Sequence, residues 1–238
     1  MKQLLVKLVS IWPVWFILLA TLVFFAPVFQ GKMPFPGDTL IGAYQPWRGL
    51  SWQGRTTEYP LKNMTISDVT SSLYPWRYLA VKQMKEGKWP LWNNYEFSGT
   101  PLLAVPYTAA FYPLNFLFFL LPFTGAWTML IVLQPLLAGI FFYFFLLNKK
   151  LSKTSSCFGA VCFAFGSYFL NTTEFSILGH TALWFPLALL SVDKLFEKPR
   201  VSWFFILVFA LAMAVLAGFV QFIIYGYVLV IAYTLFHF

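Results

Sequence analysis

The sequence has few charged residues and almost no cysteine. Only 10% of its 238 residues are charged and 60% are apolar, whereas an average soluble domain has roughly 25% charged residues. Such a chain lacks the polar residues needed to cover a water-soluble domain of this size. Cys157 and Cys162, its two cysteines, are five positions apart in an apolar segment, which places them on different faces of a helix. We therefore expect neither a disulfide nor a metal bound through these cysteines.

Motifs of soluble enzymes are missing as well. The chain has no P-loop, no glycine-rich dinucleotide motif and no G-x-S-x-G nucleophile motif. His180 and His237, the two histidines, are far apart, and no group of His, Cys and acidic residues has metal-ligand spacing. The residues themselves therefore predict no metal site.

The positive net charge of +8 does not indicate a nucleic-acid partner. Eight of the sixteen Lys and Arg residues lie in short segments beside apolar runs, and the other eight lie in one long polar segment, interleaved with acids. Basic residues beside apolar runs are typical of cytoplasmic membrane loops. We therefore expect the chain to be embedded in a lipid bilayer and not to bind nucleic acid.

Long uncharged apolar runs are what the sequence has in abundance. A helix of roughly 20 such residues spans the hydrocarbon core of a bilayer, so these runs predict an all-α, polytopic transmembrane helix bundle. The first run is longer than the apolar core of a signal peptide and has no cleavage site after it, which indicates an uncleaved helix. About six spans are predicted, at residues 8–29, 125–147, 154–170, 181–196, 202–217 and from 222 to the end.

The apolar segment 107–123 is predicted not to cross the membrane. Only some ten residues follow Pro113 within it, which is too few for a span. If it lies at the outer surface, all short basic segments fall on the cytoplasmic side, as the positive-inside rule requires. This predicts a first transmembrane helix at 1–29 with a cytoplasmic N-terminus, an extracytoplasmic loop at 30–123 with juxtamembrane or re-entrant helices, and a helix bundle at 124–238.

The last predicted span has no basic residue or polar tail after it. The sequence stops at His237-Phe238, at the end of an apolar run. We expect the chain to be part of a longer membrane protein.

Two acids of the long polar loop are candidate catalytic bases. Asp38 follows the first predicted span by nine residues, and the prolines before it hold it close to the membrane surface, where it could take a proton from a hydroxyl. Asp68 is the second candidate. Each acid also fits a helix N-cap, Asp38 for a helix from Thr39 and Asp68 for one from Val69.

Four other polar residues are candidate substrate ligands. Arg48 and Arg77 each follow Pro-Trp, and a guanidinium beside an indole suits either a substrate phosphate or bulk phospholipid headgroups. Glu174 and His180 fall in a predicted outer turn at 171–180, where His180 fits either a substrate ligand or an interfacial cap. All four are expected to face the same compartment as Asp38 and Asp68.

A series of short motifs, in this order and spacing, resembles the N-terminal third of the YfhO-type family of bacterial membrane proteins. The motifs are Pro36-Gly37-Asp38, Ser67-Asp68-Val69, Tyr74-Pro75-Trp76-Arg77, Gly87-Lys88-Trp89-Pro90-Leu91-Trp92-Asn93, Gly99-Thr100-Pro101-Leu102-Leu103-Ala104, Phe111-Tyr112-Pro113-Leu114 and Trp184-Phe185-Pro186-Leu187. The sequence departs from the family at Asn94, where a proline is usual, and at Gly218-Phe219-Val220-Gln221, where G-H-P-Q is frequent.

The resemblance implies a fold and a function. The family is similar to GT-C glycosyltransferases, which use polyprenyl-phosphate sugars on the extracytoplasmic face of the bacterial cytoplasmic membrane, with a catalytic acid at the position of Asp38. It implies sugar transfer to a cell-envelope polymer such as teichoic acid, and leaves open a divalent metal at Asp68. The competing hypothesis is a non-catalytic transport or scaffold subunit of envelope assembly. A transporter would be expected to place polar residues at mid-membrane, in broken helices.

Overall fold

A computed structural model describes residues 12–51 and 64–237. The described chain is all-α except for one small antiparallel hairpin, in which Trp92 pairs with Pro101 and Asn93 with Thr100. The elements up to the hairpin are α2 (Trp12–Phe24), η1 (Ala26–Gln30), α3 (Asp38–Ala43), η2 (Trp47–Gly49), η3 (Met64–Ile66), η4 (Val69–Leu73), α4 (Tyr74–Lys85), β1 (Trp92–Asn93) and β2 (Thr100–Pro101). Those after it are η5 (Pro106–Thr108), η6 (Pro113–Phe116), α5 (Leu117–Leu120), α6 (Phe123–Asn148), α7 (Lys153–Ala164), α8 (Ser167–Thr172), η7 (Thr173–Phe175), α9 (Ile177–Ala182), α10 (Phe185–Glu197), α11 (Val201–Leu216) and α12 (Val220–His237).

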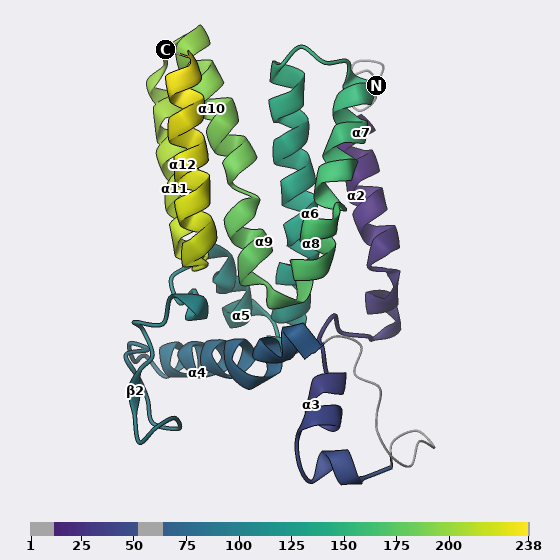
Figure 1. Cartoon of the computed structure of the whole chain (residues 1–238), viewed down its shortest axis with the longest axis vertical. Coiled ribbons are helices and arrows are strands. Elements are labelled where there is room, and N and C mark those ends of the chain that lie inside the picture. Colours follow the sequence, from purple (N-terminus) through teal and green to yellow (C-terminus); the bar gives the residue numbers. More distant parts are fainter. Residues whose placement is uncertain (1–11, 52–63, 238) are drawn as a thin grey trace.

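The helices form a bundle with an elaborate cap at one end. Figure 1 shows α2, α6, α7, α10, α11 and α12 running side by side, while α4 lies across one end of the bundle and α3 extends beyond it. The turns from α6 to α7 and from α10 to α11, which contain basic residues, lie at the opposite end together with the end of α12. We call the end that carries α3, α4 and the hairpin the capped end. The capped end holds the candidate acids.

Two of the described helices, α6 and α12, are long and apolar enough to cross a membrane, and α2 and α11 are shorter apolar helices. Large apolar side chains lie exposed along the outer faces of these helices, among them Phe16, Val23, Phe205, Val228 and Leu235. Water-soluble proteins rarely expose an apolar surface of such extent. The apolar helices and this exposed apolar surface are typical of a membrane protein.

The structure corrects two of the predicted spans. The segment 154–170 is not one helix, because α7 ends at Ala164 and α8 begins at Ser167. The second correction is that the span predicted at 181–196 begins earlier, with α9 at Ile177, and is interrupted between Ala182 and Phe185. Hydropathy alone does not reveal such breaks, since the interrupting residues are themselves apolar or small.

The segment 107–123 forms short turns, as expected from its prolines. It contains η5, η6 and the four-residue helix α5, so no continuous helix covers it. The sequence also marks the end of α4: this helix ends at Lys85, and Gly87 has a φ of +73°, the left-handed conformation typical of glycine after a helix.

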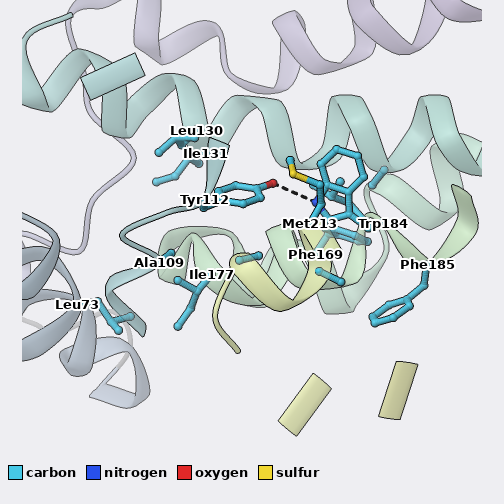
Figure 2. Packing of buried hydrophobic residues seen from close by; sticks show 14 of the residues in the cluster. Leu73, Ala109, Tyr112, Leu130, Ile131, Phe169, Ile177, Trp184, Phe185 and Met213 are labelled. Carbon is cyan, nitrogen blue, oxygen red and sulfur yellow. Dashed lines mark hydrogen bonds between the residues drawn. The ribbon is translucent and has the colours of Figure 1, made fainter. Parts of the chain in front are cut away.

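Small residues allow the bundle helices to pack closely. A Cβ atom on Gly139 of α6 would lie 2.9 Å from Cγ2 of Ile17 in α2, and one on Gly226 of α12 would clash with the ring of Phe185 in α10. Close approach at small residues is the usual way in which membrane helices associate. Figure 2 shows the centre of the core, where Tyr112 points toward Trp184 and Met213 of α11 lies beside it.

Asp193, which the sequence analysis did not select, joins three helices at the end opposite the cap. It is 4% exposed, and Nζ of Lys149 lies 2.8 Å from its carboxylate. The Tyr233 hydroxyl donates to Oδ1 at 2.7 Å, and Nε2 of His237 lies 2.9 Å from the same atom. Because Lys149 directly follows α6, and Tyr233 and His237 lie in α12, the carboxylate fixes the ends of both helices to α10.

Candidate functional site

Asp38 and Glu174, 136 positions apart in the sequence, line one cavity of about 350 Å³ at the capped end. Both carboxylate side chains are half-buried. Phe24 and Phe25 from the end of α2 and Leu170 from α8 also line the cavity. The cavity therefore has an acidic part in the cap and an apolar part formed by bundle helices.

The N-cap interpretation of Asp38 is wrong. Asp38 is the first residue of α3, Gly37 occupies the cap position, and no side chain caps the helix. The next residue, Thr39, is buried, and its hydroxyl donates to the Pro36 carbonyl at 2.7 Å and lies 2.8 Å from the Thr70 hydroxyl. These contacts attach the start of α3 to the segment that follows Asp68.

Asp68 lines a second cavity, of about 390 Å³, together with Trp76, Tyr107 and residues of α9. It occupies the N-cap position of the π-helical turn η4, as the sequence predicted for Asp68, but its side chain makes no capping hydrogen bond. Its side chain is exposed. Asp68 is thus accessible to a ligand in this cavity.

The turn η7, which contacts η4, contributes residues to both cavities. Thr173 and Glu174 of η7 line the Asp38 cavity, whereas Phe175 lines the Asp68 cavity. One short turn therefore contributes to both, and the structure does not place the two acids in a single pocket.

Arg77 is enclosed within the protein, whereas the sequence suggested a side chain open to a substrate phosphate or to phospholipid headgroups. It is 3% exposed, and its Nη1 donates to the Ser176 hydroxyl at 2.8 Å. Its guanidinium lies over the Trp127 ring, 5.3 Å from the ring centre. Burial lowers the pKa of Arg77 to about 10, so that it remains cationic at neutral pH. The α4 helix turns this arginine inward, where it holds the turn that carries Glu174.

Arg48 has the opposite environment. It lies in η2 and is exposed. It does not line the Asp38 or the Asp68 cavity among the described residues. The structure thus separates the two Pro-Trp-Arg sequences and does not bring Arg48 and Arg77 to one phosphate site.

His180 is also enclosed, which corrects its expected place in an outer turn. It belongs to α9, is 2% exposed, and its Nε2 lies 2.9 Å from the Leu130 carbonyl oxygen, to which it must donate. Its Nδ1 then accepts from the Tyr112 hydroxyl at 3.0 Å, and the Trp184 indole donates to Tyr112 at 3.1 Å (Figure 2 shows the latter bond). Both ring nitrogens are occupied, so His180 joins helices and is not available as a substrate ligand.

Gln134 and Ser176 position the site, and neither was predicted from the sequence. Gln134 in α6 is fully buried, and its Nε2 donates to the Thr173 carbonyl at 2.9 Å. Ser176 has a φ of +66°, an unusual conformation for a residue other than glycine, and accepts from Arg77. A lone Gln inside an apolar run of α6 was the one visible hint, because buried polar residues of membrane helices often have a specific partner.

No group of three or more His, Cys, Asp or Glu side chains within residues 12–51 and 64–237 could hold a metal ion. The arrangement instead offers two acid-lined cavities, each beside apolar bundle helices. Comparisons of the chain with protein-family models, with curated proteins and with solved structures give no match.

Proposed function

We propose that the chain is part of a membrane glycosyltransferase of GT-C type, which transfers a sugar from a polyprenyl-phosphate donor to a cell-envelope acceptor on the extracytoplasmic face. The observation that carries the proposal is the cavity shared by Asp38 and Glu174. Its apolar walls from α2 and α8 suit a lipid-linked donor, and its carboxylates suit a reaction that removes a proton from a hydroxyl.

In this reaction Asp38 accepts the proton of the acceptor hydroxyl while the hydroxyl oxygen attacks the anomeric carbon. The new glycosidic bond forms as the bond from that carbon to the phosphate oxygen breaks, and polyprenyl phosphate leaves with inversion at the sugar. Glu174 lines the same cavity and is placed to accept a hydrogen bond from a sugar hydroxyl.

The test is transfer of a radiolabelled hexose from polyprenyl phosphate into envelope polymer, in membranes that contain the chain. We expect incorporation well above that of membranes from cells without it. Equal incorporation in the two preparations, with the chain present and folded, would overturn the proposal.

The proposed arrangement has about six spans, formed by α2, α6, α7–α8, α9–α10, α11 and α12, with the capped end outside the cytoplasmic membrane of a bacterium. This orientation is supported by the position of the turns that contain Lys149, Lys150 and Lys198, which lie at the end of the bundle opposite the capped end (Figure 1). An excess of Lys and Arg is typical of the cytoplasmic side.

This orientation predicts the labelling of single cysteines in intact cells. In a variant without Cys157 and Cys162, Phe97→Cys at the capped end is expected to react with a membrane-impermeant maleimide, and Ser152→Cys between α6 and α7 is expected to react only after lysis. Labelling of position 152 in intact cells would reverse the orientation.

A second candidate, a transport subunit, is favoured by one specific observation. The α7–α8 and α9–α10 segments are broken helices, and buried polar side chains such as His180 and Gln134 adjoin them. Broken helices and buried polar groups occur in transporters. This candidate predicts flux of a solute across proteoliposomes without sugar transfer, whereas the glycosyltransferase predicts the reverse.

A further inference from the structure

The cap contains a groove between α4 and the β1–β2 hairpin that no step above uses. It consists of two adjoining hollows, of about 330 Å³ and 240 Å³, which share Leu79, Lys82 and Tyr95 in their walls. Trp76 lines the smaller hollow and also the Asp68 cavity. The smaller hollow therefore adjoins the Asp68 cavity at Trp76.

Hydrogen bonds hold the hairpin against α4, so the groove exists without a ligand. Nε2 of Gln83 donates to the Trp92 carbonyl at 2.8 Å, and Nε1 of Trp76 donates to Oε1 of Glu96 at 2.7 Å. One bond lies near each end of the hairpin. A groove preformed in this way spares a ligand the cost of ordering the loop.

The walls combine exposed aromatic rings with polar side chains. Trp89 is 68% exposed and Tyr95 80% exposed, and Lys82, Gln83 and Asn94 line the larger hollow beside them. An aromatic ring offers an apolar face, while the polar groups offer donors and acceptors at its rim. A pyranose ring has the matching surface, with C–H groups on its face and hydroxyls around its edge.

The hairpin reaches beyond the end of the helix bundle. Figure 1 shows it at one end of α4, with part of its backbone extending past α4 on the side away from the bundle helices. Aromatic residues of a membrane interface would be expected at the level of the helix ends.

We infer that this groove binds a glycan chain of at least two pyranose rings. The two adjoining hollows suit a chain better than a single ring. Glycan binding does not depend on the proposed function, in which the base Asp38 lines a separate cavity.

The test measures binding of chitotetraose and of maltotetraose to the protein in nanodiscs, by saturation-transfer NMR titration. We expect at least one oligosaccharide to bind, and Tyr95→Ala to weaken it roughly three- to tenfold, through loss of the ring contact. Phe97→Ala is the matched control: Phe97 lies in the same loop and is 93% exposed but does not line the groove, so binding is expected to be unchanged.

The outcomes distinguish this inference from the proposed function. Binding that is lost in Tyr95→Ala but retained in Phe97→Ala supports the groove, even if the chain transfers no sugar. If neither oligosaccharide binds, or if the two substitutions weaken binding equally, the groove is not a glycan site, even where sugar transfer is observed.

Discussion

Asp38→Asn is expected to lower the rate of sugar transfer roughly 10²–10⁴-fold, the usual contribution of a general base. The amide has the shape of the carboxylate but cannot accept the proton of the acceptor hydroxyl. Binding of the polyprenyl-phosphate donor is expected to persist, since the apolar walls of the cavity are unchanged. Transfer is measured with the radiolabelled donor in membranes, and donor binding by equilibrium titration.

Two further variants make this result specific. Glu197→Gln, an exposed acid of α10 that pairs with Lys194, is expected to transfer sugar at the wild-type rate. Asp68→Asn tests the other candidate base. Wild-type transfer by Asp38→Asn would refute the assignment, and loss of transfer in Asp68→Asn alone would give the role to Asp68.

Arg77→Ala is expected to lower the free energy of unfolding by about 3 kcal/mol or more, because it leaves a cavity and removes the donor to a buried hydroxyl. The sequence suggested instead that Arg77 binds the donor phosphate, in which case Arg77→Ala would weaken donor binding. Burial of the guanidinium between Trp127 and Ser176 makes stability the larger expected effect. Unfolding by denaturant in detergent micelles is the measurement.

Arg48→Ala is the matched control, since Arg48 also follows Pro-Trp but is exposed. Its effect on unfolding is expected to stay within about 0.5 kcal/mol. A stable Arg77→Ala protein with weakened donor binding would contradict this account and restore Arg77 as a phosphate ligand.

Local sequence properties determined several features of this protein. The scarcity of charge and the long apolar runs indicated a helical membrane bundle, because hydropathy and backbone hydrogen bonding impose helices in lipid. The prolines of 107–123 excluded a continuous helix there, and Gly87 marked the end of α4. Each of these depends on residues that are neighbours along the chain.

Tertiary structure alone decided which polar residues meet. Arg48 and Arg77 share the local sequence Pro-Trp-Arg, but only Arg77 lies on the face of α4 that packs against α6 and the turn at Ser176. In the same way, the packing of η7 brings Asp38 and Glu174 to one cavity, an arrangement that no sequence spacing encodes. The packing of the whole bundle decides which face of a helix contacts its neighbours and which side chains it meets there. This is because the free energy of burying a charge is set by groups that are distant in sequence.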